Sequence, residues 1–146
     1  MADTRGPGPV GGWLDHVLNA EVLREAYGAQ GVPEPDGLVI HEVTWHRDGP
    51  SLTLRFELPS YPAEPPEAWT ARAANTVQVE LRLLGARALL DGGPDPNPVG
   101  ALRLSAGPDG RLRAVLEAGL LRVEATADHA VLRRVSAYTK GGGCGA

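Results

Sequence analysis

The four histidines are the side chains with the widest chemical use in this chain, because imidazole can ligate metals and can transfer protons near neutral pH. They are His16, His41, His46 and His129. None stands beside a cysteine or a carboxylate at the spacing typical of zinc sites. His41 and His46 would also face opposite sides of an extended strand. The pattern favours solvated or hydrogen-bonded histidines, and we predict neither a metal site nor a cofactor.

Two segments superficially match ligand-binding motifs. The glycines at positions 6, 8 and 11 fit a dinucleotide-binding pattern, but no strand precedes them and two interspersed prolines remove N–H donors. Asp91, Asp95 and Asn97 suggest a calcium loop, but they lack its residue order and its distant glutamate. We interpret the first segment as a tail and the second as a polar loop.

Groups for covalent or acid–base catalysis are also not arranged in a known motif. The serines sit in no nucleophile elbow, and the single cysteine, Cys144, lies in a glycine-rich tail without a nearby base. Glu42, Glu57 and Glu80 alternate with apolar residues, which is typical of charges on the outer face of a sheet. Paired carboxylates could still meet in space. On balance the sequence predicts a protein that is not an enzyme.

The remaining candidates are residues that often dominate protein interfaces. Trp45, Arg47 and Asp48 lie at a predicted hairpin tip, and Tyr61 and Glu64 lie in a proline-rich loop. We predict that the partner-binding surface includes these two segments. Large aromatic residues are usually mostly buried, which favours a core position for Trp69 and, less strongly, for Trp45.

These residues must be positioned by a sheet, because hydrophobic residues recur at every second position over most of the chain. We expect strands at 38–47, 51–58, 75–83, 101–105, 111–117, 120–125 and 130–138, with residues 86–90 extending or returning. In the first strand, Val39, His41, Val43 and Trp45 would share one face. Short connections favour antiparallel pairing. The prolines within 59–69 exclude regular structure there.

The segment 13–27 has helical periodicity, interrupted at Asn19, which resembles an N-cap. The predicted fold is therefore α+β, with an N-terminal helix or helix pair packed on a mostly antiparallel sheet of about six to eight strands.

Composition predicts one globular domain. The chain has 146 residues, 42% of them hydrophobic, and a formal net charge of −4. We assign residues 1–12 to a disordered leader, 13–140 to the domain and 141–146 to a flexible tail. Mild acidity argues against sequence-independent nucleic-acid binding, and no stretch is long and apolar enough for a membrane span. A cytoplasmic location follows by default.

A set of spaced residues resembles the Immunity protein 50 family of bacterial polymorphic toxin systems. Its elements are Trp13, Tyr27-Gly28, Ile40-His41-Glu42-Val43, Arg47-Asp48-Gly49-Pro50, Leu52-x-Leu54-x-Phe56, Tyr61-Pro62, Pro65-Pro66-x-x-Trp69, the segment 75–81 and Val135-Ser136-Ala137-Tyr138. The resemblance covers most of the chain. It implies a cytoplasmic, non-enzymatic inhibitor that binds a cognate protein toxin and blocks it by occlusion, and it supplies no catalytic residues.

Two other classes of function stay open at this point. One is a small-molecule-binding or enzymatic α+β domain, which would need a pocket with convergent polar groups, for example His41, Glu42 or Arg47. The other is an accessory subunit of a bacterial assembly, which would use the same binding physics with a different partner.

Overall fold

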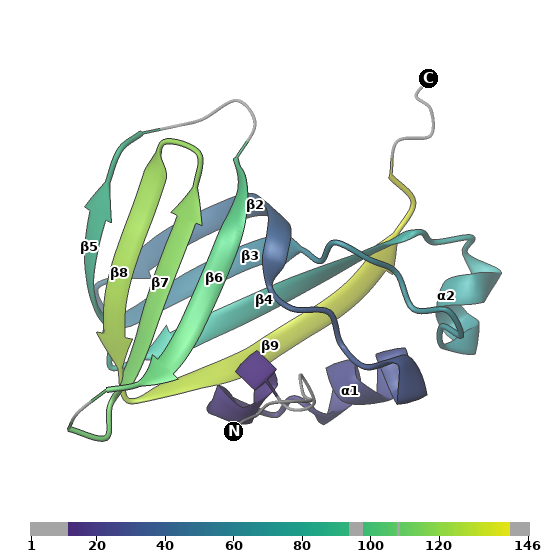
Figure 1. Cartoon of the computed structure of the whole chain (residues 1–146), viewed down its shortest axis with the longest axis horizontal. Coiled ribbons are helices and arrows are strands. Elements are labelled where there is room, and N and C mark those ends of the chain that lie inside the picture. Colours follow the sequence, from purple (N-terminus) through teal and green to yellow (C-terminus); the bar gives the residue numbers. More distant parts are fainter. Residues whose placement is uncertain (1–11, 94–97, 108, 141–146) are drawn as a thin grey trace, which may run out of the picture.

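A computed structural model describes residues 12–93, 98–107 and 109–140 of the chain. Within those residues the fold is mostly sheet, with nine strands where six to eight were expected, and with few helices (Figure 1). The elements are η1 (Gly12–His16), β1 (Val17–Leu18), α1 (Glu21–Tyr27), η2 (Gly28–Gln30), β2 (Asp36–His46), β3 (Ser51–Glu57), α2 (Glu67–Ala71), β4 (Thr76–Leu84), β5 (Arg87–Asp91), β6 (Val99–Ala106), β7 (Leu112–Ala118), β8 (Leu121–Ala127) and β9 (His129–Tyr138). Residues 1–11 of the expected leader and the whole expected tail lie outside the described residues.

The sheet has the order β1-β9-β4-β3-β2-β6-β7-β8-β5 and folds over on itself. Figure 1 shows β5, β8, β7 and β6 lying in front of β2 and β3, so that the sheet forms two layers there, while β4 and β9 extend beyond them towards α2. The predicted hairpin of β2 and β3 is confirmed, with Trp45 paired to Leu52 and Val43 paired to Leu54. All strand pairs are antiparallel except β1 with β9, which makes the sheet mixed.

The N-terminal segment differs from the expected helix pair. A 3-10 helix leads into the short strand β1, and only then does α1 begin. Asn19 is not the N-cap, because Ala20 occupies that position without a side-chain cap. Instead Asn19 adopts a φ of 67°, a left-handed conformation that asparagine tolerates, and its side-chain amide donates to the carbonyl of Leu132 at 3.2 Å. This turn lets the chain leave the sheet edge after β1.

A bulge in β2 changes which residues face the core. The register shifts between Ile40 and Glu42, leaving His41 as the additional residue. Leu38 and Ile40 are therefore buried before the bulge, whereas Val43 packs against the core after it. The prediction that Val39 and His41 share a face with Val43 is wrong, because simple alternation cannot register the inserted residue.

The core itself matches the alternation of the central strands. Leu52, Leu54 and Phe56 of β3 are almost completely buried, and so are the apolar residues of β4, which are Val77, Val79, Leu81 and Leu83. The rings of Phe56 and Trp13 lie 6.3 Å apart between centroids. Leu23, Ala26 and Tyr27 of α1 join the same apolar cluster. One core thus connects the helix with both layers of the sheet.

The proline-rich segment 59–69 contains the beginning of a helix, which alternation and proline content did not predict. Pro66 has a φ of −54° and stands at the N-cap of α2, outside the helix, where its missing N–H is not needed. Glu67 then occupies the first turn, where a negative charge is favourable. The expectation of irregular structure is therefore wrong for Glu67–Trp69.

Candidate functional site

Trp45 is half exposed at the end of β2, with 50% of its surface accessible to solvent. The prediction of a core position for this residue is wrong, because its pair with Leu52 is the penultimate one of the hairpin, where the sheet ends and little packs over the ring. Arg47 and Asp48, in the following turn, are both exposed. These three residues are called the β2–β3 tip below.

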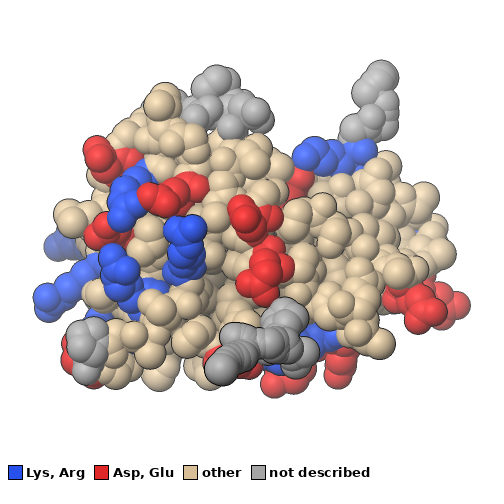
Figure 2. All heavy atoms as spheres, viewed as in Figure 1, with Lys and Arg blue, Asp and Glu red and all other residues tan. Residues whose placement is uncertain are grey.

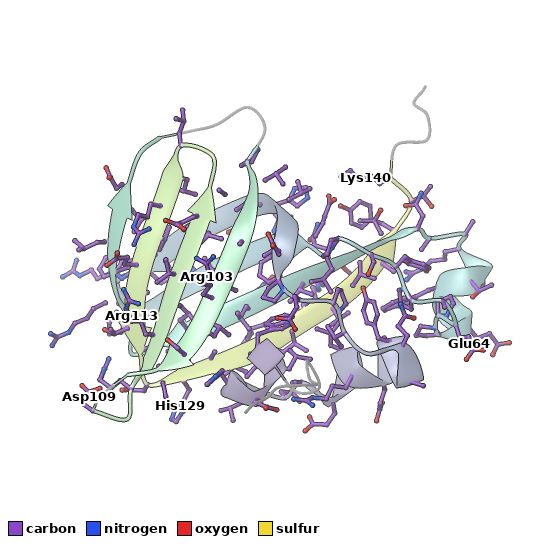
Figure 3. All side chains as sticks on the ribbon, viewed as in Figure 1. Glu64, Arg103, Asp109, Arg113, His129 and Lys140 are labelled. Atoms are coloured by element: carbon purple, nitrogen blue, oxygen red, sulfur yellow. The ribbon has the colours of Figure 1, made fainter. Side chains whose placement is uncertain are left out.

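The second predicted segment is partly a structural element. Tyr61 is half-buried, packs against the core, and its ring centroid lies 6.1 Å from that of Trp69. Its hydroxyl is buried and has no hydrogen-bond partner in the described structure. Trp69 is buried, as predicted. Glu64 is exposed at the end of the molecule that carries α2 (Figure 3).

The two segments lie at opposite ends of β3. The tip precedes Ser51, the first residue of that strand, and the proline loop follows Glu57, the last. Six residue steps of a strand span about 20 Å. The hairpin therefore does not bring Trp45 and Tyr61 together, and each end is a separate candidate for partner contact.

A cluster of titratable side chains surrounds Glu57 instead. The side chain of Glu57 is only 4% exposed. Its Oε2 lies 2.5 Å from Nε2 of His41 and also accepts a hydrogen bond from the hydroxyl of Tyr138. The Nζ of Lys140 donates to Oε1 at 2.6 Å. The prediction that Glu57 is an ordinary outward charge is thus wrong, and three neighbouring side chains occupy its carboxylate.

The protonation of this cluster follows from its contacts. Burial alone would raise the pKa of Glu57, but the hydrogen bonds from Lys140, Tyr138 and His41 outweigh it and hold that pKa below its usual value. Burial, together with the hydrogen bond to Glu57, raises the pKa of Tyr138 to about 12. Near neutral pH the carboxyl stays ionised and the phenol stays neutral. Three side chains hold the carboxylate in place, so the arrangement suits a structural role.

Sequence reasoning missed this cluster for a topological reason. Tyr138 is 81 residues from Glu57 along the chain, and only the pairing of β9 with β4, next to β3, brings the two together. The bulge at His41 then directs the imidazole to the same carboxylate. Neither the pairing of β9 with β4 nor the bulge at His41 can be inferred from the spacing of residues in the sequence.

A second polar network continues along the same face of the sheet. Glu42 accepts from Nε of Arg55 at 3.0 Å and from the hydroxyl of Thr44 at 2.6 Å. Arg55 also donates to the side-chain carbonyl of Gln78 at 3.2 Å. The pKa of Glu42 is lowered, first by the hydrogen bond from Thr44 and then by the one from Arg55. Glu42, Thr44, Arg55 and Gln78 are therefore linked by hydrogen bonds into one network on this face.

Comparison with protein families gives a match to the model described as Immunity protein 50 over residues 19–137, which is most of the chain. The chain belongs to the Immunity protein 50 family. Comparison with curated proteins and with solved structures gives no significant match. The matched region contains both ends of β3, and it ends one residue before Tyr138.

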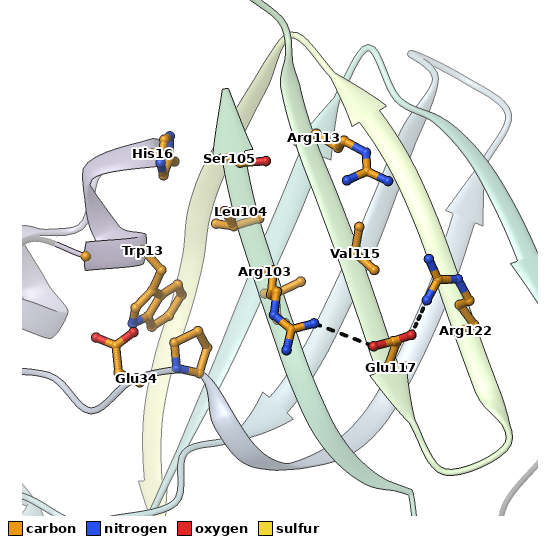
Figure 4. A pocket seen from close by; sticks show the side chains of 13 residues that line it. Trp13, His16, Glu34, Arg103, Leu104, Ser105, Arg113, Val115, Glu117 and Arg122 are labelled. Atoms are coloured by element: carbon orange, nitrogen blue, oxygen red, sulfur yellow. Dashed lines mark hydrogen bonds and ion pairs between the residues drawn. The ribbon is translucent and has the colours of Figure 1, made fainter. Parts of the chain in front are cut away.

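In this Immunity protein 50 domain, a hollow of about 730 Å³ lies over β6, β7 and β8 beside η1 (Figure 4). Arginine and glutamate side chains cover its sheet side and are paired with one another. Glu117 lies 3.6 Å from Arg103 and also pairs with Arg122, which contacts Glu124 at 2.5 Å. Figure 2 shows these charges of both signs gathered on one face. Neither His41, Glu42 nor Arg47 lines this hollow.

Two further features, a metal-binding cluster and a membrane-spanning helix, are absent from the described part of the chain. No three histidine, cysteine, aspartate or glutamate side chains there come close enough together to hold a metal ion. No helix there is both long and apolar enough to cross a membrane. The possible calcium loop predicted from Asp91, Asp95 and Asn97 falls partly on residues outside the described ranges.

Proposed function

We propose that this member of the Immunity protein 50 family protects its host cell by binding a cognate protein toxin and covering the toxin's active surface, without catalysis. The proposal includes bacterial origin and a cytoplasmic site of action. Family membership over residues 19–137 supports the general role of an immunity protein. The hydrogen bonds of His41, Tyr138 and Lys140 to the Glu57 carboxylate suit a structural role for this cluster and are consistent with a non-catalytic mode.

The observation that carries the proposed surface is the exposure of Trp45 at the β2–β3 tip. Half of its surface is accessible, and exposed Arg47 and Asp48 follow it directly. Tryptophan and arginine are the residue types most often found among the few that dominate binding energy. A large ring left in water without packing is a cost to the isolated protein that a partner would remove.

A stable interface of standard size covers about 800 Å² on each partner. The tip alone is smaller than that, so the contact must extend onto neighbouring elements. The proline loop with Tyr61 and Glu64 lies about 20 Å away along β3 and is the secondary candidate. Because Tyr61 also packs against the core and its hydroxyl is buried, Tyr61→Ala would disturb folding, and Glu64→Ala, at an exposed position, is the informative change there.

The test is co-expression with the toxin encoded by the adjacent open reading frame, with growth and co-purification as readouts. We expect the wild-type chain to restore growth and to co-purify with the toxin. The double variant Trp45→Ala, Arg47→Ala should lose both properties while keeping its thermal stability. Val22→Ala is the matched control, because Val22 is an apolar residue of similar exposure, 55%, on α1.

Two outcomes separate the parts of the proposal. Full protection and undiminished co-purification by the folded double variant would exclude the β2–β3 tip as the binding surface. Failure of the wild-type chain to protect or to bind the adjacent gene's product would contradict the proposed function itself.

A further inference from the structure

The two edges of the nine-stranded sheet are very different. One edge ends in β1, which is only two residues long. The other ends in β5, a five-residue strand that pairs with β8 on one side. No other described strand pairs with the second side of β5. A free strand edge presents backbone N–H and C=O groups to any chain that can pair with them.

The side chains of β5 are unusually exposed to solvent for a strand that contains two leucines. Leu89 is 75% exposed and Leu90 is 51% exposed. Arg87 and Asp91 at the two ends are exposed as well. Within the described residues Arg87 has no ion-pair partner, and the carboxylate of Asp91 accepts only the N–H of Gly92, at 2.9 Å. Opposite charges at the two ends therefore flank an apolar centre.

We propose that β5 pairs with β5 of a second copy of this chain, antiparallel and with the two-fold axis at Leu89. In that register Arg87 lies opposite Asp91 of the partner subunit, and the reverse pair forms on the other side of the axis. Leu89 meets its own counterpart, and Ala88 lies opposite Leu90 of the partner subunit. Directly opposite residues in an antiparallel pair have Cβ atoms about 4.5–5.5 Å apart, close enough for all of these contacts.

Charge placement favours self-pairing in this one register. Charged residues on an edge strand usually prevent pairing between copies, because like charges would meet. Here the two charges are of opposite sign and symmetric about the centre of the strand, so a two-fold axis turns them into attractive pairs. A slip by one residue would place Arg87 opposite Leu90 of the partner subunit and would lose both ion pairs.

The interface of one short strand pair is small, so association should be weak and dependent on concentration. The inference does not rest on the proposed toxin-binding function, because the tip residues are on β2 and the following turn, and the dimer involves this chain alone. Its test therefore stands whether or not a toxin is found.

The experiment is sedimentation velocity of the full-length chain over a wide range of protein concentration. We expect a monomer–dimer equilibrium for the wild type. Arg87→Asp and Asp91→Arg should each weaken self-association about tenfold or more, because each turns two attractive cross-strand pairs into repulsive ones. An equimolar mixture of the two single variants should associate again, since each then supplies the charge that the other lacks. The double variant Arg87→Asp, Asp91→Arg should associate like the wild type.

Leu89→Lys provides a second variant that leaves the charge pairs unchanged. It places two lysines opposite each other at the axis and should also weaken association about tenfold or more. Circular dichroism and thermal melting confirm that each variant stays folded. A wild-type chain that is monomeric at every concentration would overturn the proposal. A dimer that survives the single charge reversals, or that the mixture fails to restore, would overturn it equally.

Discussion

Replacing Glu57 with glutamine should destabilise the fold, although the substitution changes only the carboxylate into a carboxamide. The side chain is 4% exposed and holds His41, Tyr138 and Lys140 through its two oxygens. Glutamine keeps the shape but removes the negative charge. It also replaces one accepting oxygen by an NH₂ group. That group cannot accept the hydrogen bonds that the neighbouring side chains donate to the carboxylate.

The expected magnitude follows from the exposure of the partners. A hydrogen bond to a charged group contributes about 1.5–3 kcal/mol when buried. The side chain of Lys140 is 48% exposed and that of His41 is 33% exposed. Water can therefore replace part of the hydrogen bonding that these side chains lose in the variant. Breaking a fully buried ion pair costs about 3–5 kcal/mol, which sets an upper limit. We therefore expect Glu57→Gln to lower the free energy of unfolding by about 2 kcal/mol.

Urea unfolding monitored by tryptophan fluorescence measures this loss, and Glu42→Gln is the control. The carboxylate of Glu42 also accepts two hydrogen bonds, but its side chain is 39% exposed, so its replacement should cost less than about 1 kcal/mol. For Glu57→Gln, the urea concentration at the unfolding midpoint should fall, while the m-value, which is the slope of the unfolding free energy against urea concentration, should stay the same. Equal losses in the two variants, or a loss below about 0.5 kcal/mol for Glu57→Gln, would refute the reasoning.

We also expect the effect of Glu57→Gln on the free energy of unfolding to depend on pH. The pKa of Glu57 in the folded protein lies below its usual value, so its stabilising contribution is present above pH of about 4.3 and is lost as pH falls through the lowered pKa. The difference in unfolding free energy between the wild type and Glu57→Gln should therefore shrink progressively in acid. A difference that stays constant down to the acid unfolding transition would show that the carboxylate charge is not responsible.

Three other predictions, with four variants, test separate parts of the account. Gly100→Ala should cost more than about 2 kcal/mol in urea unfolding, because the added Cβ would lie 1.8 Å from the carbonyl oxygen of Glu117; Gly93→Ala, whose Cβ would meet nothing within 4 Å, should be nearly neutral. Similar effects of the two alanines would contradict the close approach of β6 to β7 at this glycine. The pKa of Tyr138 is raised to about 12, so its contribution is complete below pH of about 10 and disappears as pH rises towards 12; Tyr138→Phe should therefore be less sensitive to alkali than the wild type. Equal alkaline sensitivity would exclude that hydrogen bond as the cause. Trp45→Ala should change thermal stability little, because the ring is half exposed, and a large loss of stability would show instead that it belongs to the core.

Much of the fold could be predicted from local patterns. Alternation in Leu52, Leu54 and Phe56 identifies a core-facing strand, because a sheet with one apolar face has period two. Turn residues between strands then locate the hairpin of β2 and β3. The family could be identified for the same reason, since its motifs are mostly the residues that shape these strands and turns.

Features that depend on long-range pairing could not be predicted. The parallel pairing of β1 with β9 turned an expected helix into a strand, although the segment is helical in its periodicity. The extra residue His41 reversed the expected facing of the N-terminal part of β2. The carboxylate of Glu57 is held by Tyr138 and Lys140, which lie 81 and 83 residues further along the chain. At β1 and at Glu57 a contact between distant segments overrides the local pattern, and at His41 one inserted residue interrupts the alternation.

The most direct test of the account is a calorimetric titration of the purified chain with a toxin domain, taken from a neighbouring gene if that gene encodes one. We predict one toxin bound per chain, and an affinity that falls by about 30-fold or more when Trp45 and Arg47 are both replaced by alanine, as expected for loss of residues that dominate an interface. An absence of binding by the wild-type chain, while the toxin domain is folded and active, would contradict the claim that this protein works as its inhibitor.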